Sequence, residues 1–259
     1  MKIATHNGIF HTDEVTAIAL LKVFLDDKIE VERLEHNRSD FSDFDMVIDI
    51  GKKFDGIKLF DHHQYKGGKS SAGLIWDYIG KQDKYPKLSK LIKIVDDNDT
   101  GVAKAKEFEY SSLIKCYNSN DIYDIELQDK AFNRAVEFAM TIISSYKNAQ
   151  EELEEAKNII ANSYIFDNNS SILELKKFTP HWTTYINGEL TPQIKAVVWQ
   201  DENDNKYKVK IVPKKLGSFE LNAKPLNQDE MMEFIHSSGF FGVAKDEDTM
   251  KKYLRDNIK

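Results

Sequence analysis

The chain contains a single cysteine, Cys116, among its 259 residues. One cysteine cannot build an internal disulfide framework or a zinc site made of several thiolates. The apolar setting of residues 111–118 predicts that Cys116 is buried, as lone cysteines commonly are.

Long apolar runs are also missing. No stretch approaches the ~20 consecutive apolar residues that span a bilayer, and the first residues lack the apolar core of a signal peptide. We therefore expect a protein without membrane association and with a cytoplasmic location.

A surplus of positive charge is absent as well, because the formal net charge is −7. The surface as a whole is therefore not of the basic kind that binds nucleic acid. Residues 163–259 carry 14 basic and 14 acidic side chains, so the whole negative excess lies in residues 1–162. That part also holds five of the seven histidines, and bound divalent cations would offset its charge.

The order of predicted elements indicates an α/β fold. Strands are expected at residues 1–5, 29–34, 45–51 and 57–63, and helices at residues 13–25, 72–80 and 88–96. This rhythm predicts a largely parallel sheet flanked by helices. Ser70 or Ser71 is expected to cap the second helix.

The pattern changes in the second half of the chain. Residues 128–162 favour one or two long helices, and strands are expected at residues 171–178, 195–200 and 206–212, the last two as a hairpin. We predict an α/β domain over residues 1–127, a helical connector over 128–162 and a smaller α+β domain over 163–259 that binds substrate.

Acids and histidines gather where the predicted strands and the third helix end. Ligands of parallel sheets lie beyond the carboxyl ends of the strands, so these side chains are expected to meet at one edge. Imidazole and carboxylate ligands without sulfur suit manganese, iron, zinc or cobalt better than calcium. The candidates are His6, His11, Asp13, Asp49, His62, His63, Asp96, Asp97 and Asp99.

The number of candidates fits two ions better than one, because a pair of ions takes about six or seven protein ligands and a bridging carboxylate. Asp49, on the middle strand of the set, is the natural bridge. Each piece alone also has an ordinary interpretation: a His-His pair is often structural, and residues 96–99 can form a solvated turn. Their joint placement at element ends favours the metal site.

The motifs resemble those of a known family. The segments THNGIFHTDE (residues 5–14), VIDIG (47–51), DHHQ (61–64), SSAG (70–73) and DNDTG (97–101) resemble the DHH phosphoesterase superfamily. Within it, the chain is most similar to the melanocyte-proliferating-gene family of metal-dependent hydrolases. That resemblance includes HSSGFFG (236–242) and extends from residue 3 to about 253.

The resemblance implies roles for individual residues. It implies that His6 and His11 bind one ion, that Asp13 binds the other, that Asp49 bridges the two, and that His62 is a further ligand. The last ligand is Asp99, with Asp96 as the alternative. His63 is expected to face the substrate phosphate, and Asp61 to orient a ligating imidazole. His236, Ser238, Gly239 and Lys245 are expected to contact substrate from the C-terminal domain.

The resemblance implies a metal-dependent phosphodiesterase, similar to 3′–5′ exoribonucleases, that acts on RNA or short oligonucleotides. Two divalent cations, manganese first and magnesium, cobalt or zinc as alternatives, would activate water. Two other interpretations stay open: a hydrolase of pyrophosphate or a nucleotide bisphosphate, and a non-enzymatic metal-bearing protein that binds nucleotides or RNA. A homodimer also stays open.

Three lysines of the C-terminal domain leave a choice of interpretation. Lys206, Lys208 and Lys210 alternate along a predicted strand and therefore share one face. That face is either a track for a nucleic-acid backbone or an ordinary solvated face, and we favour the solvated face.

Overall fold

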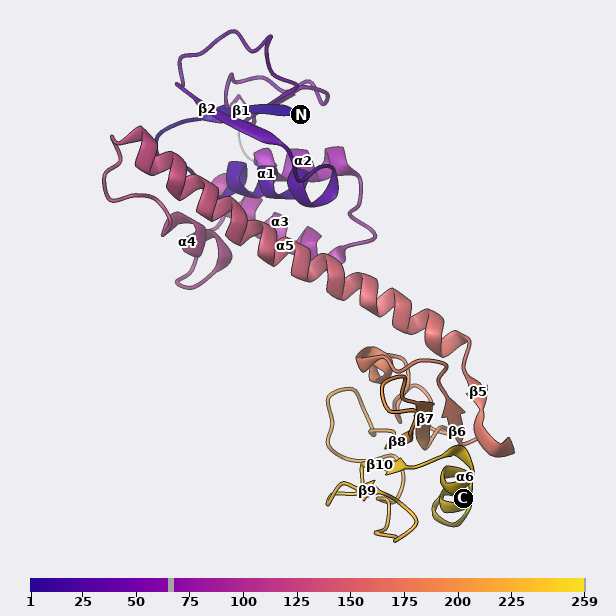
Figure 1. The fold of residues 1–259 in the computed structure, drawn as a ribbon. Coiled ribbons are helices and arrows are strands. Elements are labelled where there is room, and N and C mark those ends of the chain that lie inside the picture. The colour runs from indigo at the N-terminus through magenta and orange to yellow at the C-terminus, as the bar shows by residue number, and fades with distance from the viewer. Residues whose placement is uncertain (65–67, 259) are drawn as a thin grey trace. The chain divides into compact units, whose positions relative to one another are not determined.

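The computed structural model describes residues 1–64 and 68–258, and the chain divides into two compact units. The N-terminal unit comprises Met1–Gln150 and the C-terminal unit comprises Glu151–Lys259. The division lies inside one long helix, α5 (Ile125–Ala161), shown in Figure 1. A single helix thus occupies the region where the sequence predicted one or two, while the proposed domain boundaries at residues 127 and 162 stay predictions.

The N-terminal unit is built on a parallel sheet of four strands. Their order is β2-β1-β3-β4, and every neighbouring pair is parallel. The α/β fold with a parallel sheet is therefore confirmed. The bounds are β1 (Lys2–His6), β2 (Glu30–Leu34), β3 (Met46–Ile48) and β4 (Leu59–Phe60).

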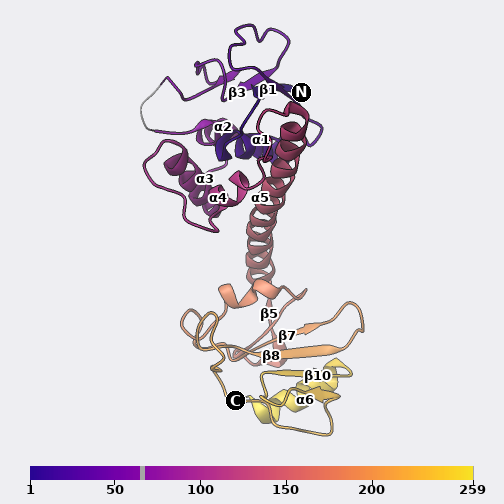
Figure 2. The same ribbon diagram turned by 90° about the vertical axis from the view of Figure 1, so that its left-hand side faces the viewer.

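Helices cover one face of this sheet, as both Figure 1 and Figure 2 show. Side chains from β1, β3 and β4 share a buried core with α1 and the helices that follow it. Ten consecutive residues of α1, from Thr12 to Leu21, are buried, which makes it the central helix of the unit. The helices are α1 (Thr12–Phe24), α2 (Ser71–Ile79), α3 (Pro86–Asp99) and α4 (Tyr110–Lys115), together with α5.

The other face of the sheet carries a smaller core. Ala4 and Val47 from the strands pack there with Phe44 and the partly buried Phe41. The connection between β2 and β3 thus covers this face, and the carboxyl ends of the strands remain free for polar side chains.

The C-terminal unit contains a mixed sheet of six strands in the order β5-β6-β7-β8-β10-β9. β6 and β7 are parallel, whereas β7 and β8 form the expected antiparallel hairpin. The last helix, α6 (Glu247–Asn257), shares a buried core with β8 and β10 (Figure 2). The remaining bounds are β5 (Tyr164–Ile165), η1 (Phe166–Asn168), β6 (Ile172–Glu174), η2 (Pro180–Thr184), β7 (Ala196–Gln200), β8 (Tyr207–Ile211), β9 (Phe234–Ile235) and β10 (Phe241–Ala244).

Two predictions from the sequence are wrong. Cys116 is exposed, because it follows the last turn of α4 on the solvent side. Helix α3 does not stop at residue 96 but continues to Asp99, so its aspartates lie within the last helical turns. No helix in the described part of the chain combines the length and the apolar character that crossing a bilayer requires.

Candidate metal centre

The connection between β1 and α1 is held in place from two sides. Gly8 adopts φ +76°, a conformation that favours glycine, and lets the chain turn after β1. The guanidinium of Arg33, on β2, donates hydrogen bonds to the carbonyl oxygens of His6 (3.2 Å) and Gly8 (2.7 Å). Asn118 hydrogen-bonds both the N–H and the carbonyl of the buried Phe10. The loop therefore presents His6 and His11 in a fixed geometry.

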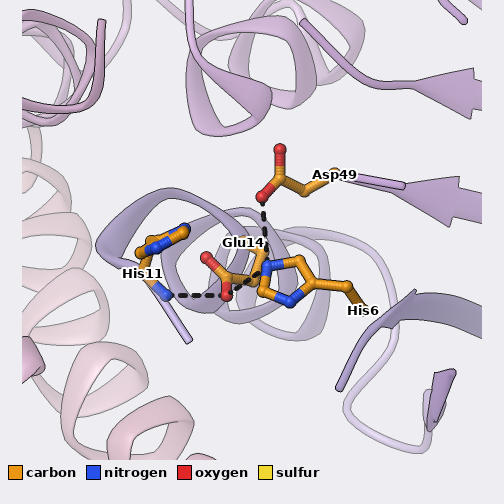
Figure 3. Close-up of side chains that lie close together, drawn as sticks. All are labelled: His6, His11, Glu14 and Asp49. Carbon is orange, nitrogen blue, oxygen red and sulfur yellow. Dashed lines mark hydrogen bonds and ion pairs between the residues drawn. The ribbon is translucent and has the colours of Figure 1, made fainter. Parts of the chain in front are cut away.

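His6 ends β1 and is almost completely buried. Its Nδ1 lies 2.9 Å from the carbonyl oxygen of Asn7, so Nδ1–H donates there and Nε2 faces the cluster. Nε2 is 3.1 Å from Oε1 of Glu14 and 3.4 Å from Oδ2 of Asp49 (Figure 3). Glu14 lies in the first turn of α1 and also accepts the backbone N–H of His11 at 2.7 Å.

Asp49 occupies the centre of the cluster. It follows β3 with φ +58°, a left-handed conformation that aspartate tolerates better than most residues. Its side chain lies between two imidazoles, with Oδ2 toward His6 and Oδ1 at 3.4 Å from Nε2 of His62. The hydroxyl of Ser71, at the start of α2, donates to Oδ1 at 2.9 Å.

His62 lies among three carboxylates. Its Nε2 is 3.0 Å from Oδ2 of Asp99 and 3.6 Å from Oδ2 of Asp13, in addition to its approach to Asp49. Asp13 is completely buried in the first turn of α1, and Asp99 is the last residue of α3. The elements β1, α1, β3 and α3 and the segment after β4 thus converge, as expected from the position of their ends.

Among the described residues, three groups of side chains bring ligand atoms within 4.8 Å of one another. Asp49 belongs to the first and second groups, and His11 belongs to the first and third, so the groups form one continuous cluster. The first group is His6, His11, Glu14 and Asp49. The second is Asp49, His62 and His63, and the third is His11, Asp13 and Asp99.

The electrostatics of this cluster are those of charges gathered out of water. Burial raises the pKa of Asp13 well above its usual value, and the neighbouring carboxylates Asp49 and Asp99 raise it further. Burial lowers the pKa of His6, but its contacts with Asp49 and Glu14 outweigh this and raise it to about 10. His62 behaves in the same way beside Asp49 and Asp99, with a pKa of about 10.

Four buried atoms of the cluster make no well-formed hydrogen bond, although two of them take part in the ion-pair contacts described above. They are Oδ1 of Asp13, Oε2 of Glu14, Oδ2 of Asp49 and Nε2 of His62. Buried polar atoms are rarely left without a partner, and here all four belong to residues of one cluster of imidazoles and carboxylates. The residues present therefore fit divalent cations, which such ligands bind readily. The identity of the ion stays a prediction.

The side chain of Asp96 contacts Ser70 instead of the cluster. Asp96 belongs to none of the three groups among the described residues. Its Oδ1 accepts hydrogen bonds from the backbone N–H (2.9 Å) and the hydroxyl (2.7 Å) of Ser70, which precedes α2. The geometry thus favours Asp99 over Asp96 as the last ligand, and Asp96 instead holds the start of α2 in place.

His63 belongs to the cluster through the second group, and its ring is paired with Asp61, which belongs to none of the three groups among the described residues. Nδ1 of His63 is 2.9 Å from Oδ1 of the buried Asp61, and this contact raises the pKa of His63. Asp61 also accepts the backbone N–H of Lys52 at 2.7 Å. The side chain of His63 is 49% exposed, so its ring reaches the cavity that contains Asp49. Asp61 therefore orients His63 more directly than it orients the ligating imidazoles.

Two members of this site do not stand out in the sequence. Glu14 adjoins Asp13 in the motif at residues 5–14, but an acid in the first turn of a helix is common and does not by itself indicate a ligand. Ser71 is expected only as a possible helix cap, although its hydroxyl contacts Asp49 and its backbone N–H lies 3.2 Å from Oδ2 of Asp13. The residue types alone give no sign of these tertiary contacts.

The predicted substrate residues of the C-terminal unit fall into two places. Nδ1 of His236 is 2.9 Å from Oγ of Ser238, and both line a cavity of about 480 Å³. Gly239 is buried, and its N–H is already bonded to the carbonyl of His236 at 2.7 Å, so it is not free for a phosphate. Lys245 lines a different cavity and pairs with Asp246 at 3.7 Å.

Comparison with known proteins gives a family and several relatives. A family model described as uncharacterised protein family UPF0160 matches residues 2–257. The chain is 28% identical to the MYG1 protein YER156C of Saccharomyces cerevisiae, over 99% of this chain and 95% of the relative. It is 36% identical to the MYG1 protein of Chlamydia muridarum, over 55% of this chain and 52% of that one.

A third relative carries a name that states an activity. The human protein named MYG1 exonuclease is 25% identical, over 93% of this chain and 81% of its own length. Among solved structures, an uncharacterised protein from Helicobacter pylori G27 covers 95% of this chain at 9% identity and a TM-score of 0.29, which supports no argument about the fold.

Proposed function

The chain belongs to the uncharacterised protein family UPF0160, and from that membership and the geometry of the cluster we propose that it is a metal-dependent phosphodiesterase. Its substrates are RNA or short oligonucleotides, shortened from the 3′ end, and its chemistry is that of the DHH phosphoesterases. The name of the human relative supports the nuclease class.

One observation carries the proposal. Asp49 lies between His6 on one side and His62 on the other, and further carboxylates stand behind each imidazole. A shared carboxylate between two ligand groups is the arrangement that holds two divalent cations side by side. His6, His11 and Asp49 would hold one ion, and Asp13, Asp49, His62 and Asp99 the other.

Divalent ions at such a cluster supply a water of lowered pKa and neutralise charge on the attacked phosphoryl group. The chain's own residues supply orientation and a proton. Nδ1–H of His63 donates to Asp61, which fixes the ring and leaves Nε2 for an oxygen of the substrate phosphate. The contact with Asp61 raises the pKa of His63, which favours the protonated ring and makes its Nε2–H a donor to that oxygen.

The test begins with protein purified without chelator. Its metal content is measured, and an oligoribonucleotide labelled at the 5′ end is incubated with it and with manganese, magnesium, cobalt or zinc. We expect manganese to give the fastest release of mononucleotides, and a ladder of labelled products that shortens from the 3′ end.

Two variants separate the site from general effects. Asp49→Asn removes the shared charge and is expected to lose both metal ions and activity. Asp97→Asn is the matched control, because Asp97 lies in the same segment as Asp99, pairs with Lys93 and belongs to none of the groups. Full metal content in Asp49→Asn would rule out the assigned bridge. Cleavage of pyrophosphate or a nucleotide bisphosphate alone would establish the small-phosphate hydrolase, and metal binding without any cleavage the non-enzymatic alternative.

A further inference from the structure

Two cavities of the N-terminal unit share part of their walls. The first, of about 420 Å³, contains His6, Asp49 and His63 of the cluster in its lining. The second, of about 370 Å³, lies against the connections that precede and follow β3. Arg38 and Gly51 line both, so the second cavity continues the first away from the metal centre.

Cationic side chains line this path. Arg38 and Lys52 line the first cavity, and Lys53 and Lys58 line the second together with Arg38. Lys52 has φ +53°, and the turn it makes after Gly51 lets two consecutive lysines serve different cavities. Arg38 and Lys52 thus lie at the cavity that contains Asp49, and Lys53 and Lys58 lie at the adjoining one.

These cations are not used to pair with the protein's own acids. Within residues 1–64 and 68–258, no ion pair joins a carboxylate to Arg38, Lys52, Lys53 or Lys58. The one described side-chain hydrogen bond among them runs from Nε of Arg38 to the carbonyl oxygen of Asp40, at 2.7 Å. The two terminal nitrogens of the Arg38 guanidinium therefore remain available to bind an anion.

Two acids near the outer part of this path, Asp55 and Asp40, accept hydrogen bonds from backbone groups. Asp55 lines the second cavity, and its Oδ1 accepts the N–H groups of residues 57, 58 and 59 at 2.8–2.9 Å. Asp40 accepts the N–H of Ser42 at 3.0 Å. That hydrogen bond lowers the pKa of Asp40, and the charges of Arg38 and Lys58 contribute to the lowering. No described ion pair ties these cations to Asp40 or Asp55, so they remain available to a ligand.

The geometry points to a phosphate track: we propose that Arg38, Lys52, Lys53 and Lys58 bind the backbone of a single-stranded nucleic acid whose end lies at the metal cluster. The inference rests on the proposed function and adds a preference for length. A single phosphate would use only the cations of the first cavity, whereas a polyanion uses both.

The lysines of β8 offer no such track. Lys206 pairs with Glu233, Lys208 pairs with Asp201 and Asp204, and Lys210 is half-buried over the ring of Phe178. These three lysines are therefore engaged within the C-terminal unit, whereas the cations beside the metal centre take part in no described ion pair.

The test compares two triple variants of the full chain with the same change in charge. Lys52→Gln/Lys53→Gln/Lys58→Gln removes the lysines of the track. Lys28→Gln/Lys87→Gln/Lys90→Gln is the control, since these exposed lysines precede β2 or lie near the start of α3, the opposite end from Asp99. The protein is first freed of metal with a chelator. Binding of a fluorescent oligouridylate decamer and of its DNA counterpart is then measured by fluorescence anisotropy over a range of salt concentrations.

We expect the track variant to bind the decamer at least tenfold more weakly than the wild type. The fall of log K with log salt should also become less steep by about 2, since each of the three lost phosphate contacts contributes ~0.7 for single strands. The control variant should keep the slope of the wild type. Equal losses in both variants, or none in either, would overturn the track. The DNA arm tells whether the sugar also contributes.

A second measurement separates this inference from the proposed function. With manganese, the loss of kcat/KM in the track variant is expected to grow from a dinucleotide substrate to a decamer. Equal losses on both substrates would contradict the preference for length. If the wild type cleaves neither substrate, the proposed function fails, while the anisotropy arm still decides whether the track binds nucleic acid.

Discussion

At Asp49 a single residue joins the two halves of the proposed metal centre. The left-handed backbone turns its carboxylate inward, and Ser71 fixes one of its oxygens. His6 and His62, on either side, hold pKa values of about 10 because of the acids around them. In the metal-free protein at neutral pH both imidazoles therefore carry a proton that a cation must displace.

This gives a prediction for pH dependence. A ligating imidazole is neutral, so metal binding must displace the proton of His6 and that of His62. Below the pKa of about 10 of these groups, each displaced proton makes the metal affinity rise about tenfold per pH unit. We expect manganese affinity to rise steadily from pH 6 to 8. Calorimetry in buffers of different ionisation enthalpy measures the protons released, and an affinity independent of pH would contradict the assigned ligands.

Among the elements, helix α2 positions the site without supplying a ligand. Ser70 is held by Asp96, and Ser71 contacts Asp49 and Asp13. Asp96 packs so closely on α2 that a Cβ at Gly73 would lie 2.4 Å from its carboxylate oxygens. Gly73 is thus required by a close approach rather than by its backbone conformation.

Gly73→Ala tests this packing. Helix propensity alone predicts that alanine stabilises the helix by ~1 kcal/mol. We expect the opposite, a loss of about 1–3 kcal/mol in the free energy of unfolding, because the new methyl group displaces Asp96. Urea denaturation measures the change. Shortening the neighbour in Gly73→Ala/Asp96→Ser should recover part of the loss, and a stabilised single variant would show that α2 has room at this position.

The elements also show what the sequence could predict. The parallel strands and the site at their ends were predictable, because apolar runs that end in acids and histidines are typical of a ligand site in an α/β fold. The choice between Asp96 and Asp99 was not, because it depends on how far α3 continues and on which aspartate of its last turns reaches His62. Short pieces such as β5 and β9 have only two residues each, and tertiary pairing rather than local pattern forms them.

On the scale of the whole molecule, the ligands belong to one of the two compact units. Every member of the three groups lies between residues 6 and 99, within the N-terminal unit. A cation that binds only the folded state stabilises that state by mass action. The effect should therefore be confined to the unit that contains the cluster.

Hydrogen exchange tests this prediction by region. At a thousandfold excess of manganese over its Kd, binding is worth about 4 kcal/mol. We expect slower exchange with metal in peptides from α1, α2 and α3, and unchanged exchange in peptides from residues 163–258. Asp49→Asn serves as the reference without bound metal. Protection that rises equally in both units would contradict a single metal centre in the N-terminal one.

The hydrogen bonds from Asn118 to Phe10 have a consequence for the order of synthesis. All proposed ligands are translated before residue 100, but the loop that carries His11 is fastened by a residue that follows them. Phe132, which packs against Phe10, and Ala139 of the same core lie on α5 and are made later still. A growing chain thus exposes a complete set of metal-binding side chains to the surrounding ions before it can select among those ions by geometry.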